Sequence, residues 1–163
     1  QTHLPFVNAD LIAAATWPGA AVEHGYEAAR LVADERARLI GLRRSFVTET
    51  VFSHPSKVDL IGQASETGYQ VLLHVLLVPE ELSVARVAHR VRRGGHAVPE
   101  DKIRSRYRRL WTLIAEARAR ADRAWVLDNS VARTPFRLVA TYEAGLLTGS
   151  PAWPAWTPEA LRN

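Results

Sequence analysis

Hydrophobic and polar positions follow two alternating patterns along the chain. Short, nearly continuous apolar runs are typical of buried strands, and the run 69–78 is the most apolar of them. The strands predicted in this way are 4–9, 46–51, 69–78 and 124–127. Between them, apolar residues recur three and four positions apart, which is the spacing of a helix with one buried face. The predicted helices are 20–43, 56–66, 79–93 and one that begins at Pro99.

This alternation predicts an α/β fold. Strands that alternate with helices form a mostly parallel sheet with helices on both faces, so we expect a three-layer sandwich in which both faces of strand 69–78 are buried. The 163 residues fit a single domain. At the C-terminal end, 136–147 predicts a β-hairpin with Ala144 and Gly145 at its turn, and the tail rich in proline and tryptophan is expected to form an irregular cap.

Basic residues concentrate in one part of the chain. The segment 86–123 carries eleven arginines and one lysine against four acids, in a chain whose net charge is +4. Its two helices are separated by the break Gly94-Gly95-His96-Ala97-Val98. A planar, permanently charged guanidinium fits phosphate oxygens, and arginines on both sides of a glycine pair suit a mobile lid. We therefore predict a lid at about 90–106 that closes on a phosphate-bearing ligand.

The arginines of this segment divide by their angle to the apolar face of each helix. Arg90 and Arg106 lie at the edge of a buried face, where a guanidinium can reach into a cleft. Six others are expected to face solvent, namely Arg92, Arg93, Arg108, Arg109, Arg118 and Arg120. Basic helices also bind nucleic acid, but no aromatic residue alternates with the exposed arginines as a stacking platform, which makes a nucleic-acid partner the weaker reading.

Composition excludes several classes of site. The chain has no cysteine, so disulfides and thiolate zinc sites are excluded. The histidines are scattered without the spacing of a metal site, and no metal ligands are assigned. No Gly-x-Ser-x-Gly motif is present, which argues against an α/β-hydrolase. With no long apolar run and no signal-peptide pattern, we expect a cytoplasmic protein without a membrane partner.

Polar side chains stand at the ends of three predicted strands, where parallel sheets bind their ligands. They are Asn8 and Asp10 after the first strand, Thr48, Glu49 and Thr50 on the second, and Asp128 and Asn129 after the last. Asp10 lies where a strand meets a helix. Its carboxylate either caps that helix or takes a proton from a substrate hydroxyl as a general base.

Glu49 shares a face with Val47 and Val51, so its carboxylate is expected where apolar side chains point. A carboxylate there needs a partner, which is either an arginine in a salt bridge, a substrate or a metal. Thr48 and Thr50 face the other way, and β-propensity alone also accounts for them. His96 in the glycine-rich break is either a ligand contact or ordinary loop surface.

Four stretches of the sequence, taken in order, resemble the zeta-toxin-like P-loop kinases. They are FVNADLI (6–12), FVTET (46–50), RVAHRVRRGGHAVPEDKIRSRYRRL (86–110) and LDNS (127–130). The Gly-Gly-His-x-Val-Pro break followed by an Arg-Tyr helix is the most specific of them. The resemblance implies a P-loop kinase fold, ATP with Mg²⁺, and transfer of the γ-phosphoryl group to a hydroxyl of UDP-N-acetylglucosamine, with an antitoxin protein as a possible partner.

The resemblance also assigns roles to the candidate residues. Asp10 resembles the acid that deprotonates the acceptor hydroxyl. Arg90 and Arg106 resemble lid arginines that neutralise charge on the transferring phosphoryl group. The substrate-binding candidates are Glu49, Thr48, Thr50 and His96, and the candidates on the nucleotide side are Arg104, Asp128 and Asn129.

One feature of that family is missing from this sequence. The phosphate loop Gly-x-x-x-x-Gly-Lys-[Ser/Thr], whose backbone and lysine hold the phosphates, does not occur, and neither Lys57 nor Lys102 follows a glycine. The first residue is Gln1 rather than methionine. We therefore expect the natural protein to have a further strand and phosphate loop before Leu4, and these 163 residues alone to have little or no kinase activity.

Two alternative functions remain open at this point. The first is a P-loop kinase or ATPase that acts on a different acceptor. The second is a non-catalytic module that binds nucleic acid through the basic surface of 86–123.

Overall fold

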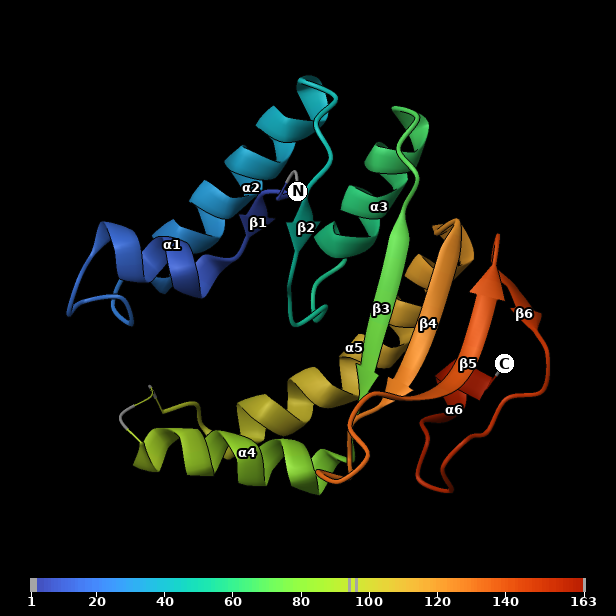
Figure 1. Cartoon of the computed structure of the whole chain (residues 1–163). Coiled ribbons are helices and arrows are strands. Elements are labelled where there is room, and N and C mark those ends of the chain that lie inside the picture. Colours follow the sequence, from blue (N-terminus) through green and yellow to red (C-terminus); the bar gives the residue numbers. More distant parts are fainter. Residues whose placement is uncertain (1–2, 94, 96, 163) are drawn as a thin grey trace. The chain divides into compact units, whose positions relative to one another are not determined.

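The computed structural model describes residues 3–93, 95 and 97–162 (Figure 1). The chain divides into two compact units, Gln1–Val51 and Phe52–Asn163. Each unit contains its own sheet. The molecule is therefore mixed α/β, as predicted, with its strands in a two-stranded sheet and a four-stranded sheet.

The first unit contains one parallel pair of strands. Its elements are β1 (Phe6–Val7), α1 (Ala9–Thr16), α2 (Gly25–Gly41) and β2 (Val47–Thr48). Phe6 lies opposite Val47 and Val7 opposite Thr48. Val7 packs with Val32 and Leu39 of α2 in a small core, so the βαβ connection is held to its strands by the apolar face of α2.

The second unit contains the larger sheet. Its elements are α3 (Ser56–Glu66), β3 (Leu72–Leu77), α4 (Glu80–Arg92), α5 (Glu100–Arg120), β4 (Arg123–Asp128), β5 (Arg137–Glu143), β6 (Leu146–Thr148) and α6 (Glu159–Arg162). The strand order is β3-β4-β5-β6. β3 and β4 are parallel, whereas β4–β5 and β5–β6 are antiparallel. The turn between β5 and β6 uses Ala144 and Gly145, both with positive φ, as tight hairpin turns require.

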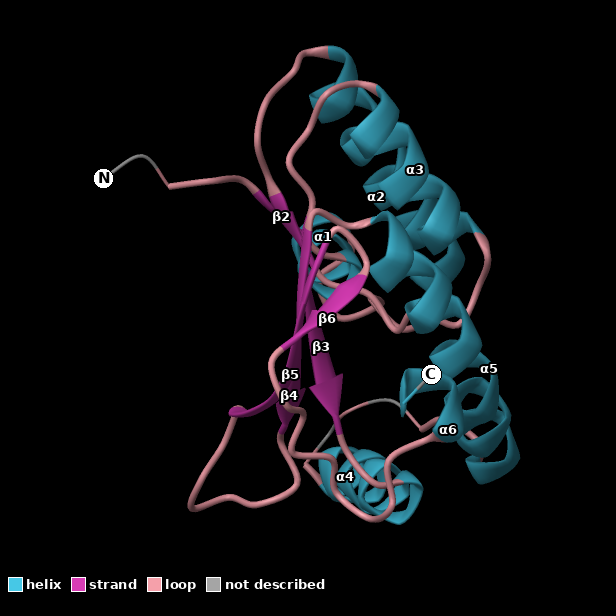
Figure 2. Ribbon diagram, turned by 90° about the vertical axis from the view of Figure 1, so that its right-hand side faces the viewer, coloured by secondary structure: helices cyan, strands magenta, loops and turns pink. Residues whose placement is uncertain are grey.

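Helices cover one face of this sheet within the unit. Figure 2 shows the strands with α3, α5 and α6 on the same side. Along β3, Val75 and Leu77 are buried, whereas Leu72 and Leu76 are about half exposed (51% and 47%). The prediction that helices bury both faces of this strand was wrong for the described residues. A continuous apolar run does not reveal this, because both faces carry leucine and valine.

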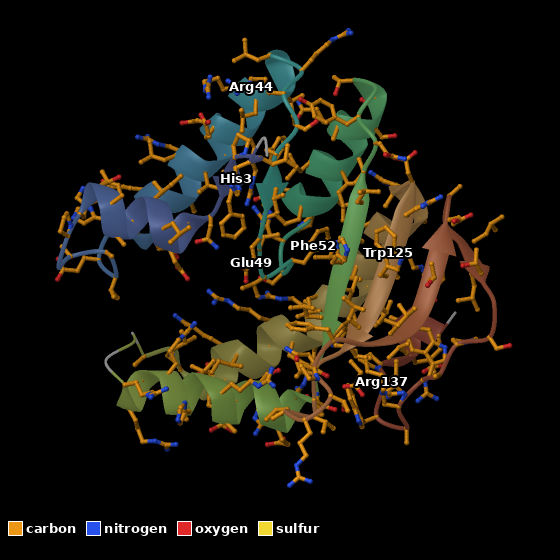
Figure 3. All side chains as sticks on the ribbon, viewed as in Figure 1. His3, Arg44, Glu49, Phe52, Trp125 and Arg137 are labelled. Carbon is orange, nitrogen blue, oxygen red and sulfur yellow. The ribbon has the colours of Figure 1, made fainter. Side chains whose placement is uncertain are left out.

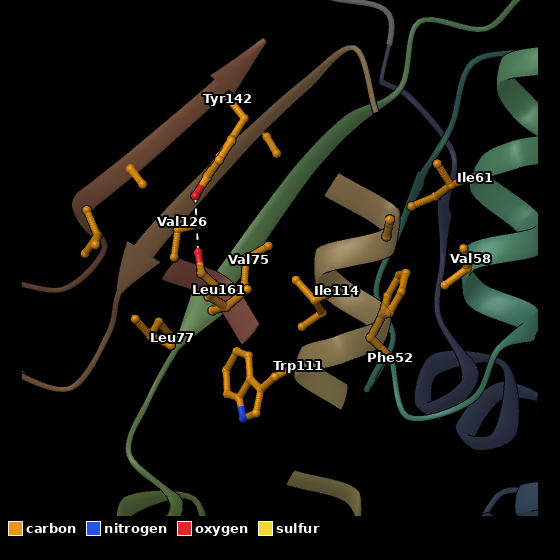
Figure 4. Close-up of a cluster of buried hydrophobic side chains, with 14 residues drawn as sticks. Phe52, Val58, Ile61, Val75, Leu77, Trp111, Ile114, Val126, Tyr142 and Leu161 are labelled. Carbon is orange, nitrogen blue, oxygen red and sulfur yellow. Dashed lines mark hydrogen bonds between the residues drawn. The ribbon is translucent and has the colours of Figure 1, made fainter. Parts of the chain in front are cut away.

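The main core lies between the sheet and α5. Figure 4 shows Trp111 and Ile114 of α5 beside Val75, Val126 and Leu161. Leu161 comes from the tail and has no exposed surface. The tail therefore ends in a helical turn inserted into the core, where an irregular surface cap was predicted.

Arg118 fixes that helical turn. Its guanidinium donates to the hydroxyl of Tyr142 (2.9 Å) and to the carbonyl of Leu161 (3.0 Å), and it stacks on the Tyr142 ring at 4.2 Å. The prediction of a solvated Arg118 was wrong, because this residue follows Ile114 by four positions and lies on the same buried face of α5.

We predict that Leu161→Ala destabilises the second unit by about 2–5 kcal/mol, because a fully buried leucine leaves a cavity when it is truncated. Leu146→Ala is the matched control, since Leu146 is 74% exposed. Urea unfolding followed by tryptophan fluorescence measures both. Equal midpoints for the two variants would contradict the placement of Leu161 in the core.

Candidate functional site

The N-terminus of α1 is capped by Asn8. The backbone of Asn8 is extended (φ −137°, ψ 134°), and its side-chain Oδ1 accepts the N–H of Leu11 at 3.1 Å. Asp10 lies in the first turn and is exposed. The capping role considered for Asp10 therefore belongs to Asn8, and no described residue hydrogen-bonds to the Asp10 carboxylate. That carboxylate stays available to a ligand.

Glu49 follows the end of β2 (Figure 3) and is exposed. Its Oε2 accepts a hydrogen bond from Nδ2 of Asn8 at 3.3 Å. No described arginine forms an ion pair with its carboxylate, so the expected salt bridge is not present in this part of the chain. Val47 and Val51, which were expected to share a face with Glu49, are themselves 48% and 62% exposed, so the burial cost inferred from period-two alternation does not arise.

Thr48 is hydrogen-bonded to Arg36, a residue that was not predicted from the sequence to belong to the site. Its hydroxyl accepts from Nε of Arg36 (2.8 Å) and donates to the carbonyl of Val7 (2.7 Å). Arg36 also donates to the backbone carbonyl of Glu49 at 3.4 Å. Only 4% of Arg36 is exposed, and burial lowers the pKa of its guanidinium.

A sequence signal for Arg36 existed. It lies four residues after Val32 and three before Leu39, both buried, so helical spacing places it on the buried face of α2. Its neighbours Glu35, Arg38 and Asp34 are charged, so local composition alone does not distinguish Arg36 from a surface arginine. Thr50, the remaining candidate of this group, is exposed.

Asp128 ends β4 and is buried. Its carboxylate accepts from the N–H of Ser130 and from the guanidinium of Arg137, each at 2.9 Å. Burial alone would raise the pKa of Asp128, but the hydrogen bonds from Ser130 and Arg137 lower it below its ordinary value. The carboxylate is thus anionic and already engaged in holding the turn after β4.

Asn129 joins three elements through its backbone. Its N–H donates to the carbonyl of Leu77 (2.9 Å), and its carbonyl accepts from Arg86 of α4 (2.8 Å). Arg86 was not singled out in the sequence, where it is one arginine among eleven. This bond anchors α4 to the loop after β4.

Arg104 links the two basic helices. Its guanidinium donates to Glu80 (3.3 Å) and Glu81 (2.5 Å) of α4 and to Glu100 of its own helix (2.8 Å). Hydrogen bonds with Glu81 and then Glu100 raise its pKa. Arg108 lies 3.8 Å from Glu80 at the edge of the same cluster.

Arg90 and Arg106 are exposed, and no described acid forms an ion pair with either. Next to Arg90 the backbone passes very close, because a Cβ at Gly95 would lie 2.7 Å from its Cγ and 3.0 Å from its carbonyl oxygen. Gly95 donates its N–H to that carbonyl (3.0 Å). Glycine is thus needed where the chain leaves α4. Gly94 and His96 lie outside the described residues.

A cavity of about 520 Å³ opens between the start of α4, the middle of α5 and the tail. It is lined by Pro79, Glu80, Glu81, Tyr107, Arg108, Trp111, Trp156 and Pro158. Tyr107 of α5 is one of these lining residues, and its hydroxyl donates to the carbonyl of Val78 (2.9 Å). The described residues contain no group of three acids or histidines placed to hold a metal ion.

The sequence candidates thus fall into two groups. Asp10, Thr48, Glu49 and Thr50 belong to the first unit, where Asn8 joins the strand ends. The basic helices, Asp128 and Asn129 belong to the second unit. The described chain contains no helix that is long and apolar enough to cross a membrane.

A known protein family matches most of this chain. The family model described as Zeta toxin matches residues 9–133. The chain belongs to the Zeta toxin family. The resemblance found in the sequence is confirmed, and membership supports a kinase-like P-loop domain in general terms. A search of the curated proteins and a search of the solved structures each found no match.

The Zeta toxin match covers both candidate groups but not the whole fold. It begins at Ala9, includes both basic helices and ends in the loop after β4. The strands β5 and β6 and the tail with Leu161 follow it. The matched span therefore carries the candidate chemistry, while later residues complete the core beneath it.

Tyr107 should give the protein a distinct alkaline transition. Burial, together with the negative charge of Glu80, raises the pKa of Tyr107 to about 12, whereas an unfolded tyrosine ionises near pH 10. Between these values the folded protein keeps a proton that the unfolded chain releases, so stability is intact below about pH 10 and falls as the pH rises toward 12.

Absorbance near 295 nm checks this prediction. The difference between the wild type and Tyr107→Phe should titrate with a midpoint near pH 12, while Tyr26→Phe, at an exposed position, should leave that component in place. A midpoint near pH 10 for the Tyr107 component would overturn it.

Arg104→Met should loosen the helix pair, because the substitution removes the contacts between α5 and Glu80 and Glu81 while keeping most of the side-chain volume. Hydrogen exchange in α4 should become faster. Arg109→Met, an exposed arginine one turn further along α5, is the control and should not change it. Unchanged exchange in both variants would show that the ion pairs do not hold α4.

Proposed function

We propose that this protein is a small-molecule kinase that transfers the γ-phosphoryl group of ATP to a hydroxyl of UDP-N-acetylglucosamine or a related nucleotide sugar. The observation that carries the proposal is the arrangement at the ends of β1 and β2. There Asn8 caps the helix that bears Asp10 and also binds the carboxylate of Glu49. Two acids thus follow adjacent parallel strands within the Zeta toxin match, Asp10 in the first turn of α1 and Glu49 directly after β2, and each has a carboxylate oxygen that no described residue binds.

Asp10 is the proposed general base. A base must have a lone pair within reach of the acceptor hydroxyl, and no described residue occupies the Asp10 carboxylate. Asp10 would take the proton of the acceptor hydroxyl.

The neighbouring residues of β2 are proposed to hold the acceptor. Glu49 has one carboxylate oxygen bound to Asn8 and the other available for a sugar hydroxyl. The exposed Thr50 can supply a second contact. Thr48 is already bonded to Arg36 and Val7, so its contribution is to the shape of the strand end.

The basic helices are proposed to serve the nucleotide. Arg90 and Arg106 keep exposed guanidinium groups suited to phosphoryl oxygens. His96 stays a proposed substrate contact. Arg104, Asp128 and Asn129 on the nucleotide side have protein partners already. They would act by holding α4, α5 and the loop after β4 in place.

The described residues do not form a complete site for ATP with Mg²⁺. The sequence has no Gly-x-x-x-x-Gly-Lys-[Ser/Thr] loop, and no described group of three acids or histidines is placed to bind a metal. We therefore derive no step through the nucleotide or the metal. The proposal concerns the acceptor side, where the residues present supply a base and a binding carboxylate. An antitoxin protein is a possible partner by family analogy.

Isothermal titration with UDP-N-acetylglucosamine tests the acceptor. We expect binding by the 163-residue chain, weakened about tenfold by Glu49→Gln, which corresponds to the loss of about 1.4 kcal/mol. Glu23→Gln, at an exposed position of the same unit, should bind as the wild type does. Failure of the chain to bind any nucleotide sugar would contradict the proposed acceptor class and favour a kinase with another acceptor.

Asp10→Asn tests the base. We expect acceptor binding to persist while phosphoryl transfer falls by about 10²–10⁴-fold, the usual contribution of a general base. Transfer is measured with radiolabelled ATP in the chain alone, where little activity is expected, and in a version preceded by a strand and phosphate loop. Asp34→Asn is the control, and retained turnover in Asp10→Asn would remove Asp10 from this role.

A further inference from the structure

We infer that Asn8 and Arg36 are positioning residues that set the geometry of the acceptor site, an inference that rests on the proposed function of Asp10 and Glu49. Asn8 was among the polar residues at the predicted strand ends but was given no role, and Arg36 was not singled out in the sequence. In the structure both residues bind Glu49, Asn8 through the Glu49 carboxylate and Arg36 through the Glu49 backbone carbonyl.

Asn8 connects the N-terminus of α1 to the side chain of Glu49. The Oδ1 of its amide accepts the N–H of Leu11, which fixes the plane of the group. The Nδ2 atom of the same planar amide then points to Glu49 Oε2. Because one rigid group makes both bonds, the first turn of α1, which carries Asp10, and the side chain of Glu49 are held in one relative arrangement.

Arg36 fixes the strand end from the inside of the unit. Its Nε binds Thr48 Oγ1, which in turn binds the carbonyl of Val7, so the guanidinium ties together the ends of both strands. A second bond reaches the carbonyl of Glu49. The backbone from which the Glu49 side chain emerges is therefore set by Arg36.

The burial and the hydrogen-bond partners of Arg36 indicate that it positions the strand end rather than stabilises the fold. The guanidinium is buried, and its described partners are a hydroxyl and a carbonyl rather than a carboxylate. Burying a charge without a carboxylate partner is costly. A protein with an apolar side chain of similar volume in its place is often as stable or more stable. We therefore expect Arg36→Met to keep the fold while the strand end loses its fixed geometry.

The Asn8→Ser variant separates the two bonds of Asn8. Serine caps a helix about as well as asparagine, but it has no amide to reach Glu49. The α1 cap should therefore survive while the Glu49 contact is lost. Arg30→Met, at an exposed position of α2, is the matched control for Arg36→Met.

The experiment combines binding with nuclear magnetic resonance. We expect Asn8→Ser and Arg36→Met to unfold at the wild-type urea midpoint or above, yet to bind UDP-N-acetylglucosamine about tenfold more weakly. Backbone order at residues 49–50 should fall in both variants and stay unchanged in Arg30→Met. In the wild type, the Nε–H of Arg36 should exchange slowly with solvent, and Thr48→Val should remove that protection.

The outcomes are separable. Wild-type order at 49–50 in both variants, or rapid exchange of the Arg36 Nε–H in the wild type, overturns the positioning role whatever the substrate. Unchanged affinity in both variants overturns it too. A large loss of stability with unchanged affinity identifies a structural role instead. If the wild type binds no nucleotide sugar, the proposed acceptor fails, and the order measurements still decide the positioning role.

Discussion

Parallel pairing of strands is the constraint on which both candidate groups depend. Parallel neighbours end on the same edge of a sheet, so side chains that follow them in the sequence meet in space even when many residues separate them. In the first unit, Asn8 follows β1 and Glu49 follows β2, and the pairing of Val7 with Thr48 brings them within hydrogen-bonding distance. In the second, β3 and β4 end together at Leu77 and Asp128. The hydrogen bond from Asn129 to Leu77 closes that edge.

The sequence predicted most of this arrangement because parallel strands and their helices have strong local signals. Ser56–Glu66 was predicted with the bounds that the structure has, and apolar runs located the strands next to Asp10 and Asp128. The second strand was predicted to run through Glu49 to Val51, whereas β2 ends at Thr48. The same local signals do not reveal which polar atoms are already engaged. Only the tertiary structure shows that Asn8 caps α1, which leaves the Asp10 carboxylate available to a ligand. It also shows that the Thr48 hydroxyl is hydrogen-bonded to Arg36.

Arginine was the residue type whose burial was predicted least well from hydrophobic periodicity. Arg36 and Arg118 are both buried, yet each stands in a charged stretch that resembles a solvated surface. A long stem and a fork of donors let arginine enter an apolar face and bind hydroxyl or carbonyl oxygens there, so charge alone does not predict exposure. Two other arginines connect separate elements: Arg104 links α5 to α4, and Arg86 links α4 to the loop after β4. Of the arginines that hydrophobic spacing placed beside a buried face, Arg90 and Arg106 keep exposed guanidinium groups.

The insertion of Leu161 into the core has a consequence for how the chain is made. During synthesis, the Zeta toxin span 9–133 and the hairpin that follows leave the ribosome before this leucine does. Until then, Trp111 and the sheet residues around it lack the side chain that fills the space between them. The second unit therefore completes its core only after the tail with Leu161 has been synthesised, and its nascent form exposes apolar surface that is prone to association.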